Sequence, residues 1–216
     1  SNAVLQEASM LFNSYTFLVL FLPISVVGYA LTCRSTGRPA RMAGAWLVAC
    51  SVVYYGWRDP SYVLLLAGSV VVSYGIGRSA HACSRPRRKR RLIAFGVVLN
   101  VVVLGVFKYA DFAVANVNAI AGSQLTLPGI VLPIGISFFT FQQIAYLVDV
   151  RQGRTTDPNF LNYCLFVSFF PQLIAGPIVH HSEMIPQFRD ASRFRFEPTR
   201  FAVGAAIFFI GLYKKA

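Results

Sequence analysis

The chain has 216 residues, of which 56% are hydrophobic and only 13% are charged. Because an ordinary soluble domain carries about 25% charged residues, this composition argues against a soluble globular protein. The formal net charge is +12, but the basic residues stand in short loops between apolar runs rather than along one helix or groove. This pattern favours the orientation of membrane helices and argues against a protein that binds nucleic acid.

The N-terminal residues Ser1, Asn2 and Ala3 resemble the remnant of a removed tag and are left out of the fold prediction. The natural start would then be Met10. A cleavable signal peptide is not expected, because no basic residue precedes the apolar run that begins near Leu18.

Four apolar segments follow in the first half of the chain. A helix needs about 20 mostly apolar residues to cross the roughly 30 Å hydrocarbon core of a bilayer. The predicted spans are residues 11–32, 42–55, 62–76 and 92–107. Pro23 is expected to kink the first of them. The predicted fold is therefore an all-α, polytopic transmembrane bundle.

Two basic loops fix the predicted orientation of these spans. Arg34, Arg38 and Arg41 follow the first span, and a denser basic run at residues 85–91 precedes the fourth. Because two spans separate the loops, both lie on one face, which the positive-inside rule makes the cytoplasmic face. The N-terminus and the loop at Trp57 are then expected outside the bacterial inner membrane. A specific site for anionic lipid is the alternative interpretation of the denser run.

The second half of the chain is less regular. Residues 110–130 are mildly amphipathic, so a loop or an interfacial helix fits better than a span. Two apolar segments follow, at 132–148 and 160–178, and both contain helix breakers. The breakers are Pro133, Gly135, Pro171, Gly176 and Pro177. Unpaired backbone groups are costly in lipid, so broken helices that line a polar interior path are one interpretation and ordinary kinked spans are the other.

The last basic stretch constrains the topology of these broken segments. If both were full spans, the stretch around Arg193 would lie outside, against the positive-inside rule. A re-entrant segment, which enters and leaves on one face, restores the agreement and is the preferred interpretation. Residues 201–213 begin a further apolar segment that is short of a full span.

No catalytic or metal-binding motif is evident. The 4 cysteines form no CxxC pair, so no metal site is expected. His81 is expected to be a solvated loop residue. His180 and His181 follow a broken segment, where a histidine could act as a general base, but a structural or interfacial role is preferred. Asp149 stands beside Arg151, and an interfacial ion pair would explain it.

Two longer stretches resemble a known family. Residues 132–153, LPIGISFFTFQQIAYLVDVRQG, resemble a signature of the membrane-bound O-acyltransferases. Residues 169–188, FFPQLIAGPIVHHSEMIPQF, resemble the second signature, in the branch that contains the alginate O-acetylases. MLFNSYTFL from residue 10 and GLYKK at residues 211–215 are similar to that branch as well. The resemblance runs from about residue 10 to the last residue.

The resemblance implies an enzyme that moves an acyl group, usually acetyl, to a hydroxyl acceptor. The donor would be acetyl-CoA or an acyl carrier on the cytoplasmic side, used as substrate, with no bound cofactor. The acceptor would be an exported polysaccharide, as in alginate biosynthesis, or another cell-envelope molecule. The resemblance also implies a helical bundle with a central tunnel, and a periplasmic acetyl-handling partner protein.

The chain departs from the family in length. Members are about twice as long, and their essential histidine lies in a later helix, beyond the equivalent of Lys215. The resemblance therefore implies that residues 1–216 are the N-terminal part of one acyltransferase domain, incomplete at the C-terminus, without a catalytic residue and inactive alone. Residues expected to line the tunnel or contact substrate, each of which could equally serve packing, are Gln142, Gln143, Gln172, Gly176, Pro177, His180 and His181.

A fragment of a transporter or channel is the alternative function, because discontinuous helices also mark solute paths. The chain shows neither the internal symmetry nor the mid-span carboxylate that is typical of such proteins. A purely structural membrane subunit would leave the two signatures unexplained.

Overall fold

The computed structural model describes residues 12, 14–34, 39–57, 59–122, 132–133, 135–154, 159–173, 184–187 and 197–215. Every regular element within these ranges is a helix, which confirms the all-α prediction. The chain divides into two compact units. The first comprises Ser1–Val63 with Ile185–Ala216, and the second comprises Leu64–Met184.

The described part of the chain contains 3 helical stretches that are long and apolar enough to cross a membrane. They are Thr16–Cys33, Pro60–His81 and Pro86–Ile120, and they contain most or all of three of the four predicted spans. The remaining predicted span, residues 42–55, lies within the 18-residue helix α3 (Pro39–Gly56), which is not among these three. The multi-pass membrane character follows from these helices.

The first unit begins with a π-helix, η1 (Thr16–Phe21), which continues directly into α2 (Leu22–Cys33). The change of helix type falls at Pro23, which occupies the first turn of α2. Proline has no backbone N–H and its ring collides with the carbonyl one turn earlier, and the wider π turn relieves both conflicts. A kink was predicted at Pro23, and the structure has a change from π-helix to α-helix one residue before it. Helix α10 (Pro198–Lys215) also belongs to this unit.

Aromatic side chains form the core of the first unit. Phe17, Phe21 and Tyr54 are buried, and their ring centroids lie within 5.8 Å of one another. The indole nitrogen of Trp46 on α3 donates a hydrogen bond of 3.0 Å to the carbonyl oxygen of Ser25 on α2. These contacts pack α3 against the first helical stretch.

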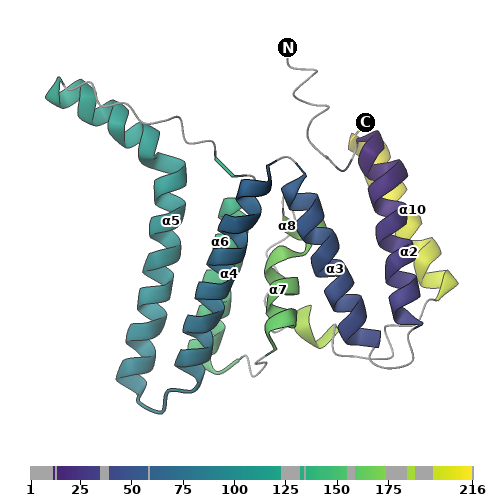
Figure 1. The fold of residues 1–216 in the computed structure, drawn as a ribbon, viewed down its shortest axis with the longest axis horizontal. Helices are drawn as coiled ribbons and strands as arrows, with labels where there is room; N and C mark the ends of the chain where they lie inside the picture. The colour runs from purple at the N-terminus through teal and green to yellow at the C-terminus, as the bar shows by residue number, and fades with distance from the viewer. Residues whose placement is uncertain are drawn as a thin grey trace. The chain divides into compact units, whose positions relative to one another are not determined.

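The second unit contains most of α4 (Pro60–His81), α5 (Pro86–Ala121), α6 (Ile136–Gln152), α7 (Phe160–Ser168) and α8 (Phe170–Leu173). A short turn joins α4 to α5, so the two helices run antiparallel (Figure 1). Helix α6 packs on α5, where Gly96 leaves room for the side chain of Leu147. Helix α7 meets α6 through the rings of Tyr146 and Tyr163, whose centroids are 4.4 Å apart.

Helix α5 is longer than predicted. Its 36 residues span about 54 Å at a rise of about 1.5 Å per residue, well beyond the roughly 30 Å core of a bilayer. Residues 110–121, for which a loop or an interfacial helix was predicted, are helical. The C-terminal part of α5 turns away from the axis of its N-terminal part (Figure 1). For residues 110–121 the loop alternative is therefore wrong, whereas the interfacial position of this helix stays a prediction and residues 123–130 lie outside the described residues.

The two broken segments differ in detail. Gly135 has a left-handed φ of 78° directly before α6, so the breakers Pro133 and Gly135 precede an uninterrupted helix rather than dividing one. In the second segment, Phe169 leaves the helical conformation (ψ 107°) and separates α7 from α8. Pro171 lies within the short α8, where the first turn tolerates it. Gly176 and Pro177 lie outside the described residues.

Candidate functional site

A chain of polar side chains, of which three are buried and one, Ser69, is half-buried, joins α4, α5 and α6. Ser69 and Ser73 stand one helical turn apart on α4, Asn100 projects from α5, and Gln143 projects from α6. Asn100 is 5% exposed and Gln143 is fully buried. We refer to these four residues as the polar layer.

The hydrogen bonds of the polar layer run in one direction. The Asn100 amide nitrogen donates to the Ser73 hydroxyl (3.0 Å), which donates to the Gln143 amide oxygen (2.7 Å). The Gln143 amide nitrogen then donates to the Ser69 hydroxyl (2.9 Å), which donates to the carbonyl oxygen of Leu66 (2.8 Å). Each hydroxyl serves as both acceptor and donor, so the groups polarise one another. The layer ties α4, α5 and α6 together.

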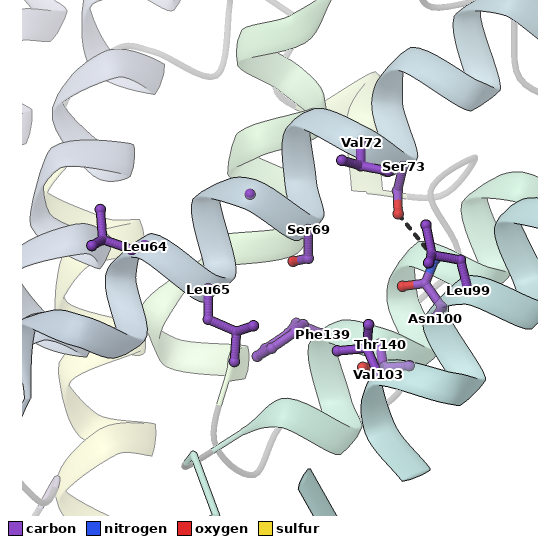
Figure 2. Close-up of a pocket in the computed structure, with 11 residues that line it drawn as sticks. Leu64, Leu65, Ser69, Val72, Ser73, Leu99, Asn100, Val103, Phe139 and Thr140 are labelled. Atoms are coloured by element: carbon purple, nitrogen blue, oxygen red, sulfur yellow. Dashed lines mark hydrogen bonds between the residues drawn. The ribbon is translucent and has the colours of Figure 1, made fainter. Parts of the chain in front are cut away.

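A cavity of about 310 Å³ lies beside the polar layer. Figure 2 shows its walls, which come from α4, α5 and α6 and are mostly apolar. Its lining residues are Leu64, Leu65, Gly68, Ser69, Val72, Ser73, Leu99, Asn100, Val103, Phe139 and Thr140. The Asn100 amide nitrogen also donates to the Gly96 carbonyl oxygen (2.9 Å). The Asn100 amide oxygen accepts no hydrogen bond from the described residues, so a donor in the cavity can use it.

The structure separates two adjacent glutamines, each of which was predicted to line a tunnel or contact substrate and could equally serve packing. Successive residues of an α-helix point about 100° apart, and only Gln143 reaches the polar layer. Gln142 is 4% exposed, and its amide oxygen is buried without a hydrogen-bond partner among the described residues. An unpaired buried amide oxygen is costly. Gln143 therefore has a structural role, and Gln142 is the better candidate for contact with a ligand.

The other predicted site residues lie elsewhere. Gln172 is buried in α8, at 8% exposure. His180 and His181, like Gly176 and Pro177, fall outside the described residues, so their assignment to a tunnel stays a prediction. His81 is exposed in the last turn of α4, which agrees with a solvated role.

Asp149 corrects one expectation. Its side chain is only 2% exposed near the C-terminal end of α6, whereas Arg151 is exposed, and the structure records no ion pair between them. The interfacial ion pair expected from their spacing is wrong, because neighbours two apart on a helix point to different sides. Asp149 is a buried carboxylate, which is uncommon inside a membrane protein and often functional.

Ser69, Ser73 and Asn100 were not identified as site residues from the sequence. A signal was present, since two serines at i and i+4 share a helix face and Asn100 interrupts an otherwise apolar run. Small polar residues are also frequent in membrane helices that merely pack closely. Only the pairing with Gln143 distinguishes these possibilities, and that contact joins residues 70 positions apart.

Comparison with known proteins finds relatives of one family. The profile described as MBOAT, membrane-bound O-acyltransferase family, matches residues 135–216. A peptidoglycan O-acetyltransferase of Helicobacter pylori is 39% identical over 99% of this chain and 45% of its own length. A protein of Pseudomonas aeruginosa named "Probable alginate O-acetylase AlgI" is 38% identical over 95% of this chain and 39% of its own length.

A further relative of the latter name, from Azotobacter vinelandii, is 37% identical over 95% of this chain and 41% of its own length. The chain thus spans less than half the length of each of these three relatives. No solved structure shows a significant match. The resemblance of the two sequence signatures to the membrane-bound O-acyltransferase family is confirmed.

Proposed function

We propose that the chain forms part of a membrane O-acyltransferase that transfers an acyl group, most simply acetyl, to a hydroxyl of a cell-envelope glycan. The observation that carries this proposal is the identity of 38–39% to a peptidoglycan O-acetyltransferase and an alginate O-acetylase along nearly the whole chain. Those two names share the transferred group and a glycan acceptor, and they differ in the glycan. The acceptor of this protein therefore belongs to the same chemical class.

The proposed reaction exchanges a thioester for an oxygen ester. The acceptor oxygen bonds to the acyl carbon while a general base removes the hydroxyl proton. The carbon–sulfur bond of the donor then breaks, and the thiolate leaves as a thiol after taking up a proton. Exclusion of water protects the donor from hydrolysis. By family resemblance, the base is a histidine that follows the equivalent of Lys215.

This chain would contribute walls and hydrogen bonds rather than the base. The cavity beside the polar layer is mostly apolar, as the path of an acyl group requires, and it offers the free amide oxygen of Asn100. Gln142 adds a second unpaired amide oxygen within α6. Amide oxygens accept hydrogen bonds from hydroxyl or amide N–H groups, which both acceptor and donor molecules of this class carry.

The orientation follows from charge. We place the loop between α4 and α5 in the cytoplasm of a bacterial cell, on the donor side, and the Trp57 loop outside. The acceptor glycan lies outside the cell membrane, so the acyl group must cross it. An acetyl-handling partner protein on the outer side would complete the transfer.

The test uses the complete gene product, purified in detergent and supplied with an acyl thioester. Release of free thiol should require a glycan acceptor, and mass spectrometry should find the acyl group on that acceptor. Peptidoglycan fragments and alginate oligomers, tested in parallel, distinguish the two acceptor types. Replacing the later histidine with alanine should abolish thiol release. Transport of a solute by vesicles that contain the protein, with no thiol release under any condition, would support the transporter alternative and overturn this proposal.

A further inference from the structure

One end of the second unit gathers basic side chains from three helices. The contacts of Asn100 with Ser73 and of Gly96 with Ile76 show that α5 runs antiparallel to α4. The contacts of Ser73 with Gln143 and of Gly77 with Tyr146 show that α6 runs parallel to α4, and thus antiparallel to α5. The end of α4, the start of α5 and the end of α6 therefore lie at the same end of the unit (Figure 1). The exposed cations at this end, which we call the basic rim, are Arg78, Arg85, Arg87, Arg88, Arg90, Arg91, Arg151 and Arg154.

The basic rim has no acidic counterpart in the described part of the chain. The first turn of α5 contains no acidic residue, and Asp149, the one nearby described carboxylate, is 2% exposed. The ion pair recorded between described residues joins Arg200 to Glu197 in the first unit. Arginines at a helix N-terminus also face the positive end of the helix dipole. An external anion would relieve this accumulation of positive charge.

Three of these arginines continue an apolar stripe on α5. Counting along the helix, Arg87, Arg88 and Arg91 lie on the face opposite buried Ile93 and Asn100. The same face continues with exposed apolar side chains at the spacing of successive turns after Arg91. They are Phe95, Val98 and Val102, with 60%, 59% and 53% of their surfaces exposed.

We propose that this face of α5 binds one anionic phospholipid, with its phosphate held by Arg87, Arg88 and Arg91. An acyl chain of this lipid would lie along Phe95, Val98 and Val102, which follow the arginines on the same face. A phospholipid has the same order, with a charged headgroup followed by hydrocarbon. Guanidinium groups can bind a phosphate through two parallel hydrogen bonds each, which an ammonium group cannot do. The site is thus distinct from the positive-inside effect, which depends on charge alone.

The test compares variants of the whole chain in nanodiscs that contain phosphatidylcholine with a minor fraction of phosphatidylglycerol. Native mass spectrometry counts the phosphatidylglycerol molecules retained after release from the disc. The decisive variant combines Arg87→Lys, Arg88→Lys and Arg91→Lys, because it preserves charge and orientation. Lys108→Gln is the matched control, since Lys108 is exposed on the same helix far from the rim.

We expect the native chain and the control to retain phosphatidylglycerol in preference to phosphatidylcholine. In the triple lysine variant this preference should be about tenfold weaker, which corresponds to about 1.4 kcal/mol. Val98→Asn should lower retention as well, because it interrupts the stripe without changing charge. Equal retention of phosphatidylglycerol by the native chain and the lysine variant would overturn the proposed site. It would leave only a general attraction between positive charge and anionic lipid. Displacement of the lipid by millimolar inorganic pyrophosphate would identify a soluble phosphate as the ligand and overturn the assignment to lipid.

Discussion

Gly77 on α4 lies directly against the ring of Tyr146 on α6, so that a Cβ atom built at residue 77 would overlap that ring. The ring of Tyr146 in turn packs on Tyr163 of α7. The absence of a side chain at one position thus allows three helices to meet. Close approach at small residues is the usual way in which membrane helices associate, because lipid offers no hydrophobic driving force between them.

Gly77→Ala should destabilise the protein. The added methyl group must push aside a fully packed aromatic ring, and overpacking of this kind costs about 1–3 kcal/mol. Gly75→Ala on the same helix is the control, since no described atom apart from the nearby backbone of the helix itself lies within 4 Å of a Cβ atom there. The measurement is the apparent melting temperature in detergent. Equal melting temperatures for the two variants would show that Tyr146 moves aside without cost.

Gly135→Ala should be more harmful than Gly122→Ala. Both glycines have a left-handed φ, 78° and 62°, which costs alanine about 1 kcal/mol. Only at Gly135 would the new Cβ atom also lie 2.7 Å from the carbonyl oxygen of Leu173, and nothing lies within 4 Å at Gly122. Protease resistance of the region around α8, followed over time in detergent, measures the difference. A larger effect at Gly122 would contradict the contact between α8 and the start of α6.

Asn100→Ala should lower stability by about 0.6–1.7 kcal/mol, the range measured for hydrogen bonds between membrane helices. The change removes the donor to Ser73 and so weakens the polar layer at its first link. Asn116→Ala on the same helix is the control, because the exposed Asn116 donates to the carbonyl oxygen of Phe112 in its own helix and to no other helix among the described residues. Thermal unfolding of both variants should therefore separate them, with Asn116→Ala close to the native protein.

The sequence was sufficient to predict the helices whose formation depends on the transfer of apolar side chains from water to lipid. The apolar runs at residues 11–32, 62–76 and 92–107 predicted spans because burial in lipid depends mainly on local composition, and the long apolar helices Thr16–Cys33, Pro60–His81 and Pro86–Ile120 contain most or all of them. The breaks at Gly135 and Phe169 were predicted only approximately, since Gly and Pro mark where a helix is weakened but not which residue leaves it. For α5, the polar residues after Phe107 suggested an end, whereas the helix continues to Ala121.

The candidate site was less predictable than the fold. Adjacent Gln142 and Gln143 look equivalent in the sequence, and their different roles depend on which of them faces Ser69 and Ser73 on another helix. Asp149 shows the same limit, because its spacing from Arg151 suggested an ion pair although its side chain is buried. Contacts between distant helices decide such roles, and neither composition nor spacing encodes them directly.

The proposed orientation can be tested with a natural cysteine. Cys83 lies in the turn between α4 and α5, beside the basic rim, and is partly exposed. In a variant with Cys33→Ser, Cys50→Ser and Cys164→Ser, a membrane-impermeant maleimide should not label Cys83 in intact spheroplasts and should label it after permeabilisation. Adding Trp57→Cys to a variant without Cys83 should reverse the result, because Trp57 is 49% exposed in the loop predicted to lie outside. Labelling of Cys83 in intact spheroplasts would show that the orientation of the protein is the reverse of the one proposed.

The adjacent pair Gln142→Leu and Gln143→Leu should separate function from structure. Gln143→Leu removes two hydrogen bonds, 2.7 and 2.9 Å long, and strands Ser69 and Ser73 in the interior, so the melting temperature should fall. Gln142→Leu replaces an amide oxygen that has no hydrogen-bond partner among the described residues with an apolar group of similar size, which is neutral or stabilising when no partner is lost. If Gln142 contacts a substrate, thiol release by the complete gene product should nevertheless drop, by about tenfold for one lost hydrogen bond of about 1.4 kcal/mol. A Gln142→Leu protein with native activity and raised stability would show that Gln142 only fills space. If Gln142→Leu were less stable than Gln143→Leu, the roles assigned to both residues would be contradicted.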